Sequence, residues 1–129
     1  VGYPIVGLAY PGGGINCDER VANIIRNNTP IRYCRTTGQS NSFDLQNNLY
    51  QFVPSIPHVK SKEQLMMLGE RFLALTPDKP QIFYIWGHSF ELDWWNAWDD
   101  LEEFFQLISG KNDIFYGTNQ EVLLVGKDN

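Results

Sequence analysis

His88 follows an apolar, strand-like run in the stretch FYIWGHSFELDWW, residues 83–95. An imidazole at the end of a strand can act as a general acid or a general base, because it exchanges a proton near neutral pH. A structural histidine bonded to a loop carbonyl is the alternative. The polar residues that follow His88 suggest which chemistry is open to it.

Glu91 and Asp93 follow His88 closely. The three side chains could be metal ligands, but their spacing matches no known ligand geometry. One acid that orients the imidazole, with the other solvated, fits the pattern better. Ser89 could be a nucleophile, yet GHSF lacks the second glycine of the strained nucleophile elbow.

A second unusual stretch, YPGGG at residues 10–14, matches neither glycine-rich phosphate signature. Because Gly12 and the two glycines after it have no side chains, their backbone amides could approach an oxyanion closely. A tight turn into the following helix explains the glycines equally well.

Three tryptophans, Trp94, Trp95 and Trp98, lie within five residues. Helical spacing prevents all three from facing one core, so at least one should be half exposed and cover the active edge or meet a partner. His58, in the stretch PSIPHVKS, has no role that the sequence assigns.

Composition sets the class of protein. The 129 residues fit a single domain, 1–129, and the 43% hydrophobic and 19% charged residues argue against disorder. The net charge of −5 argues against nucleic-acid binding, and no apolar run is long enough to span a membrane. The two cysteines lack metal-ligand spacing and are interpreted as free thiols. Free thiols and the lack of a visible signal peptide favour a cytoplasmic location.

The elements that position these residues follow from periodicity and capping signals. Strands are predicted at residues 3–9, 31–35, 81–86 and 113–116, with a further extended run at 120–125. Helices are predicted at residues 18–27, 61–75 and 96–109, the last two capped by Ser61 and Asn96. Residues 36–60 read as a long loop.

Alternating strands and helices predict an α/β fold with a parallel sheet and right-handed crossovers. In such sheets, ligands gather at the carboxyl ends of the strands. AYPGGG follows the first predicted strand and WGHSFELD follows the third, so both stretches are expected at that edge.

Three stretches carry a resemblance to a known family: LAYPGGGIN (8–16), IRYCRT (31–36) and the run 81–122, with YIWGHSFE as the most specific part. Together they resemble the later part of a polysaccharide deacetylase domain of the NodB-homology type, over most of the chain. The resemblance implies a partial (β/α) barrel of parallel strands alternating with helices. It also implies a metal-dependent hydrolase that removes N- or O-acetyl groups from an acetylated oligo- or polysaccharide.

The resemblance assigns roles to individual residues. His88 matches the strand-end histidine that protonates the leaving group in the family. The family's Arg-Pro-Pro-Tyr-Gly motif is matched loosely by residues 9–13, which makes the Gly12 amide the oxyanion donor. Ala9 replaces the motif's arginine, which in the family supports the catalytic aspartate. Tyr10, Trp86 and Trp94 are then candidate sugar contacts.

Two motifs of the family are missing. Asp99-Asp100 lies inside a predicted helix and so does not match the strand-end aspartate pair, and the two histidines are thirty positions apart instead of at helical spacing. The divalent metal that the family implies, zinc or similar, therefore has no ligands in this chain. Both motifs precede the tyrosine-proline segment in the family, which leaves three explanations: a fragment, favoured by the absence of an initial Met, a natural half without catalysis, or a half completed by another polypeptide.

The sequence therefore predicts that the chain alone is inactive as a deacetylase. A partial barrel also exposes strand edges, so pairing into a homo-oligomer is expected. A non-catalytic carbohydrate-binding or assembly module on the same scaffold is the alternative function.

Overall fold

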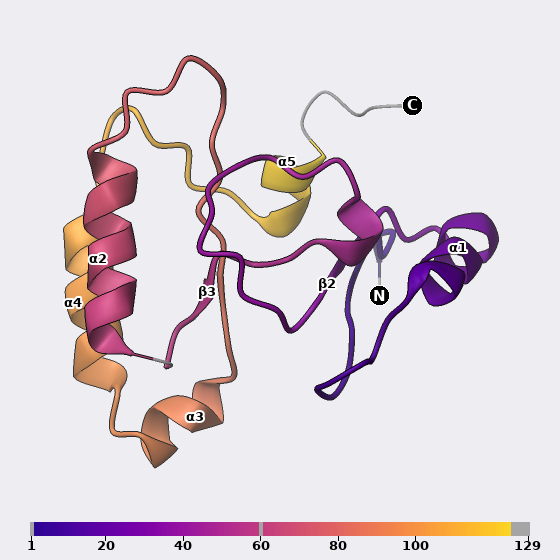
Figure 1. Cartoon of the computed structure of the whole chain (residues 1–129), viewed down its shortest axis with the longest axis horizontal. Helices are drawn as coiled ribbons and strands as arrows, with labels where there is room; N and C mark the ends of the chain where they lie inside the picture. The colour runs from indigo at the N-terminus through magenta and orange to yellow at the C-terminus, as the bar shows by residue number, and fades with distance from the viewer. Residues whose placement is uncertain (1, 60, 125–129) are drawn as a thin grey trace. The chain divides into compact units, whose positions relative to one another are not determined.

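The computed structural model describes residues 2–59 and 61–124, which form two compact units (Figure 1). Unit 1 consists of Val1–Gly38, Gln46–Val53 and Phe115–Asn129. Unit 2 consists of Gln39–Leu45 and Pro54–Ile114.

Unit 1 is built on a β-α-β arrangement. Strand β1 (Gly7–Ala9) pairs in parallel with β2 (Tyr33–Arg35), and helix α1 (Glu19–Asn28) connects them. Asp18 begins α1 by accepting a hydrogen bond from the Val21 N–H at 2.8 Å. The short helices η1 (Leu49–Gln51) and α5 (Asn119–Leu123) complete the unit.

Unit 2 also contains one parallel strand pair, β3 (Ile56–Pro57) and β4 (Ile85–Trp86). Its helices are α2 (Lys62–Leu73), α3 (Ser89–Trp94) and α4 (Trp98–Ile108). Helices α2 and α4 lie side by side in Figure 1, and Gly69 allows their close approach. A Cβ at Gly69 would lie 2.9 Å from the Phe104 ring.

The core of unit 2 joins these helices to the strand pair. Its buried members are apolar side chains from the segment before β3, from β3 itself and from both long helices: Phe43, Ile56, Leu65, Leu68 and Phe104. Phe83, just before β4, packs edge-on against Phe104 with ring centroids 5.7 Å apart. The helices therefore support β4, which ends two residues before His88.

The local predictions hold where capping signals are strong. Helices α1 and α2 confirm the predicted helices, and the Ser61 hydroxyl accepts from the Gln64 N–H at 3.3 Å. Strands β1, β2 and β4 lie inside the predicted strands but are shorter.

The predicted helix at 96–109 and the loop at 36–60 need correction. Helix α4 begins at Trp98 after Ala97, because Asn96 has a φ of 50° and forms the turn that follows α3. Helix α3 itself was not predicted. The loop contains η1 and β3.

The prediction was wrong at the C-terminal end. Residues 113–116 form no strand, and the run predicted as extended is helix α5 as far as Leu123. Thr118 begins α5 with a capping box, in which the Thr118 hydroxyl and the Glu121 carboxylate bind each other's backbone N–H. Val125 lies outside the described residues.

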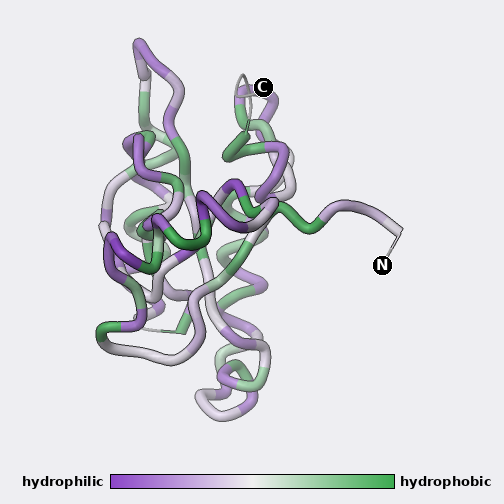
Figure 2. The backbone as a smooth tube through the Cα atoms, turned by 90° about the vertical axis from the view of Figure 1, so that its right-hand side faces the viewer, coloured by the Kyte–Doolittle hydropathy of each residue, from purple (hydrophilic) through white to green (hydrophobic). Residues whose placement is uncertain are grey.

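The fold class is thus mixed α/β with short parallel strand pairs. Within the described residues the strands form two separate two-stranded sheets and no closed barrel. None of the described helices is long and apolar enough to cross a membrane, and Figure 2 shows hydrophobic and hydrophilic residues alternating along the backbone.

Candidate active site

His58 and His88 lie at the same edge of the β3–β4 pair. Both strands run in the same direction, and each ends just before one of the histidines. The backbone N–H of His58 donates to the Trp86 carbonyl at 2.9 Å, which continues the parallel ladder. The strand pairing therefore brings together two histidines that are far apart in the sequence.

Glu91, in the first turn of α3, faces both imidazoles with one carboxylate oxygen. Its Oε2 accepts the backbone N–H of His88 at 2.9 Å and lies 3.2 Å from His88 Nδ1. The same oxygen lies 3.7 Å from His58 Nε2. Because Glu91 engages Nδ1, the Nε2 atom of His88 is the ring nitrogen left for a ligand, on a side chain that is 52% exposed.

The charges at this cluster follow from burial and hydrogen bonding. Burial acts to raise the pKa of Glu91, but hydrogen bonds from the His88 backbone and imidazole outweigh it and hold that pKa below its usual range. Burial also lowers the pKa of His58, and the nearby Glu91 carboxylate opposes this only in part. At neutral pH the cluster thus contains an ionised Glu91 beside a neutral His58.

The His58 ring is packed tightly against Gly87. Its side chain is 8% exposed, and its Nδ1 is buried with no hydrogen-bond partner among the described residues. A Cβ at Gly87 would lie 1.6 Å from the Cδ2 atom of His58. Only glycine at position 87 therefore leaves room for the imidazole beneath Glu91.

Replacing Gly87 with alanine is expected to destabilise unit 2 by about 1–3 kcal/mol or to expel the His58 ring, because the added methyl group overlaps it. Denaturant unfolding and the NMR signals of His58 would measure this. The Gly87→Ala, His58→Ala double variant should recover part of the loss. Gly13→Ala, where a Cβ meets nothing within 4 Å, is the control. Equal stability of Gly87→Ala and Gly13→Ala, with unchanged His58 signals, would contradict this packing.

The imidazole of His88 belongs to a row of four aromatic rings, called the ring row: Trp86, His88, Phe90 and Trp94. The ring of His88 stacks on Phe90 with centroids 5.1 Å apart and meets Trp86 edge-on at 5.9 Å. Phe90 meets Trp94 at 4.7 Å, and Trp94 is 76% exposed. The prediction of at least one half-exposed tryptophan is confirmed.

Two further tryptophans follow the ring row in the sequence. Trp95 and Trp98 are also exposed, and the indole N–H of Trp98 donates to the Asp93 carboxylate at 2.7 Å. Of the two acids after His88, Glu91 therefore contacts the imidazole, whereas Asp93 binds a tryptophan.

This arrangement suits proton transfer at an exposed surface. A carboxylate at Nδ1 fixes the orientation of an imidazole and leaves Nε2 to receive or deliver a proton. The neighbouring rings provide flat apolar faces on which a ligand can stack beside that nitrogen.

The predicted residues Tyr10 and Gly12 belong to unit 1. Tyr10 is buried, its hydroxyl donates to the Tyr50 carbonyl at 2.9 Å, and burial is the main cause that raises its pKa. Gly12 is exposed with a φ of +70°, and a Cβ there would meet nothing within 4 Å. Trp86, by contrast, lies beside His88 in the ring row.

The residues of the candidate site do not fit a metal centre. Across residues 2–59 and 61–124, no three His, Cys, Asp or Glu side chains are placed to hold an ion. Glu91 already accepts a backbone N–H, and the second histidine is turned toward the same carboxylate oxygen. What these side chains offer a ligand is therefore a proton donor or acceptor at His88 Nε2.

Sequence reasoning missed His58. Its strand, β3, has two residues and ends in Pro57, and proline usually argues against a strand. The available signal was a β-branched Ile56 between two prolines, followed by a histidine, in a loop too long to lack structure.

No protein-family model, curated protein or solved structure matches this chain.

Proposed function

We propose that this chain is the later part of a polysaccharide deacetylase, in which unit 2 supplies the general acid and a sugar-binding surface. The observation that carries the proposal is an exposed imidazole held at Nδ1 by Glu91 and flanked by exposed aromatic rings. The resemblance of YIWGHSFE to the family supports the same role for His88. In the intact protein, the strands would belong to a (β/α) barrel.

In this proposal, the protonated Nε2 of His88 donates its proton to the departing amine or alcohol. The bond between the acetyl carbon and the sugar nitrogen or oxygen breaks, water supplies the new oxygen of acetate, and the sugar leaves with a free amino or hydroxyl group. The ionised Glu91 stabilises the imidazolium before transfer.

A sugar ring would lie on the ring row. Sugars present apolar C–H faces that pack on aromatic rings, and Trp94 offers the most exposed ring of the row. Unit 2 contains five Lys and Arg residues against eleven Asp and Glu residues, so it favours a neutral or cationic saccharide over an anionic one.

A binding measurement on the 129-residue chain tests the surface. Titration calorimetry with an N-acetylglucosamine tetramer should give a saturable signal, and Trp94→Ala should weaken binding by roughly two- to tenfold. Tyr3→Ala removes an exposed ring from unit 1 and is the matched control. A chain that binds no oligosaccharide, or a Trp94→Ala variant that binds as well as the control, would refute the sugar-binding role.

A non-catalytic carbohydrate-binding module is the second candidate function. The lack of a metal-binding group within the described residues favours it, because the ring row alone would suffice for binding. The two functions differ at His88, because an enzyme requires its imidazole for the rate of the reaction and a binding module does not.

A further inference from the structure

His58 is a buried titratable side chain that the proposed reaction leaves without a role. Its side chain is 8% exposed, and its Nδ1 is buried with no hydrogen-bond partner in the part of the chain that the structure describes. A buried nitrogen without a partner destabilises a fold, whereas an apolar side chain of similar size would fill the same space beside Gly87 without that penalty. Packing alone therefore does not explain a histidine at this position.

The other ring nitrogen of His58 faces the oxygen that holds His88. Burial lowers the pKa of His58, so the ring is neutral at neutral pH and carries a single N–H. Its Nε2 lies 3.7 Å from Oε2 of Glu91, and a lone pair directed at that carboxylate would be repelled. The N–H of His58 is therefore on Nε2, and its lone pair is on the buried Nδ1.

Three nitrogens thus surround one oxygen of Glu91. Two belong to His88, the backbone nitrogen at 2.9 Å and Nδ1 at 3.2 Å, and the third is Nε2 of His58. The contact with His58 is longer than a hydrogen bond and acts by electrostatic attraction. His58 is nevertheless the rigid member, because its ring packs against Gly87 and its backbone N–H donates to the Trp86 carbonyl, whereas the side chain of His88 is 52% exposed.

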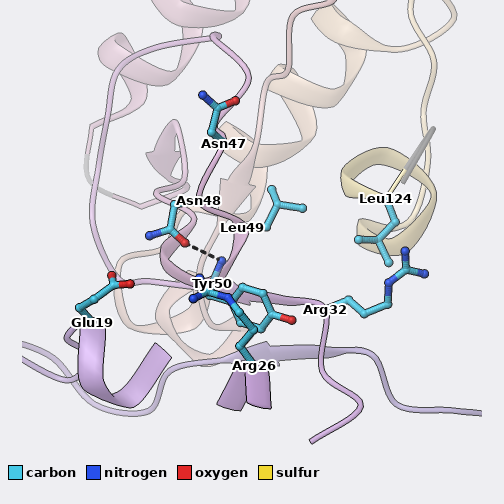
Figure 3. A pocket seen from close by; sticks show the side chains of 8 residues that line it. All are labelled: Glu19, Arg26, Arg32, Asn47, Asn48, Leu49, Tyr50 and Leu124. Carbon is cyan, nitrogen blue, oxygen red and sulfur yellow. Dashed lines mark hydrogen bonds between the residues drawn. The ribbon is translucent and has the colours of Figure 1, made fainter. Parts of the chain in front are cut away.

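In the open pocket of unit 1, by contrast, two polar side chains of the lining are fully explained by contacts within the unit (Figure 3). Arg26 lies over the Tyr50 ring, 4.6 Å from its centroid, and donates to Asn23 Oδ1. Asn48 accepts the Tyr50 N–H at 3.2 Å, the contact drawn in Figure 3. These contacts stabilise the unit and require no further function, unlike the buried imidazole of His58.

We propose that His58 is a positioning residue, whose Nε2–H holds the Glu91 carboxylate in the place from which it fixes His88. The proposal rests on the proposed acid role of His88, because an imidazole fixed at Nδ1 keeps Nε2 available for the departing amine or alcohol. His58 acts only through Glu91 and has no contact of its own with the substrate. The positioning is a property of the 129-residue chain, so it can be measured without turnover.

NMR of the ¹⁵N-labelled 129-residue chain tests the proposal, because the ring nitrogen shifts distinguish the two neutral forms of an imidazole. The chain has only two histidines, so the spectrum is simple. At a pH well above the usual histidine pKa of about 6.5, His58 should carry its proton on Nε2 and His88 on Nδ1, both toward Glu91. A proton on Nδ1 of His58 would overturn the proposal.

Replacing His58 with leucine should shift neutral His88 toward its Nε2–H form by roughly two- to tenfold, because Glu91 loses its rigid neighbour. His58→Gln should restore the Nδ1–H form, since its amide nitrogen can take the position of Nε2. His58→Phe covers the case in which His58→Leu fails to fold. Asp93→Asn is the matched control and should change nothing, because Asp93 binds Trp98 instead. An unchanged His88 in the leucine and phenylalanine variants, or an equal shift in His58→Gln, would refute the positioning role.

The rate gives a second measurement in a protein that supplies the metal-binding motifs. His58→Leu should lower kcat of the proposed deacetylation roughly tenfold and leave KM unchanged, and His58→Gln should recover most of the loss. A kcat of His58→Leu equal to that of an active parent would contradict the proposal. If the unaltered protein removes no acetyl groups while His88 responds as stated, the proposed function fails and the positioning of Glu91 by His58 stands.

Discussion

Replacing His88 with alanine should lower the rate of the proposed deacetylation by roughly a hundredfold or more, the usual contribution of a general acid. The measurement requires a protein that also supplies the metal-binding motifs, in the same chain or in a second one. His88→Ala removes the only imidazole of the site that is exposed, since the other belongs to the buried His58. Without a proton donor, the amine or alcohol must leave as an anion, which raises the barrier.

The same variant separates an enzyme from a binding module. An enzyme should lose rate while its affinity for the oligosaccharide stays within a few-fold, because Trp94 and Phe90 remain. A binding module has no rate to lose and should keep its affinity. Tyr3→Ala, outside unit 2, is the control for unspecific effects on activity.

The assay of the isolated chain completes this test. On an acetylated chitooligosaccharide with added zinc or cobalt, the 129-residue chain is expected to show no turnover. Turnover at the rate of an ordinary deacetylase would show that the missing motifs are not required. A His88→Ala protein as fast as its parent would exclude His88 as the acid.

Replacing Phe104 with alanine should destabilise unit 2 by about 3–5 kcal/mol, the usual cost of deleting a buried phenylalanine. Phe104 is 1% exposed and packs on Phe83 and against Gly69. The surrounding side chains come from two helices and a strand, so they cannot all move in to fill the cavity. Urea unfolding followed by tryptophan fluorescence would report on unit 2, which contains all four tryptophans.

The neighbouring residue provides the matched control. Phe105 has the same side chain on the same helix but is 54% exposed, and Phe105→Ala should cost less than about 1 kcal/mol. Similar losses of unfolding free energy in the two variants would mean that α4 does not pack on the core through the face that carries Phe104. A large loss for Phe104→Ala should also disturb the NMR signals of His88, because the same core supports β4.

The helices of this protein show how far local signals reach. Ser61 begins α2 as predicted, because a cap needs only a side chain and an N–H three residues later. Asp18 caps α1 in the same way, one residue before the helix, although it was predicted as the first helical residue. Helix α5 has an equally local signal in Thr118 and Glu121, yet its apolar residues resemble an extended run. In this segment the capping residues predict the helix better than the apolar pattern does, because a helix of five residues is too short to show a helical period.

The candidate sites divide in the same way. The stretch GHSFE by itself predicted His88 at a strand end, with an acid within reach in the next turn. Tertiary structure alone decided that His58 meets the same carboxylate, because the contact depends on the parallel pairing of β3 with β4. It also placed Arg26 over the ring of Tyr50. Residues that are 24 or 30 positions apart leave no mark in a sequence window, and only the packing of the elements between them sets their distance.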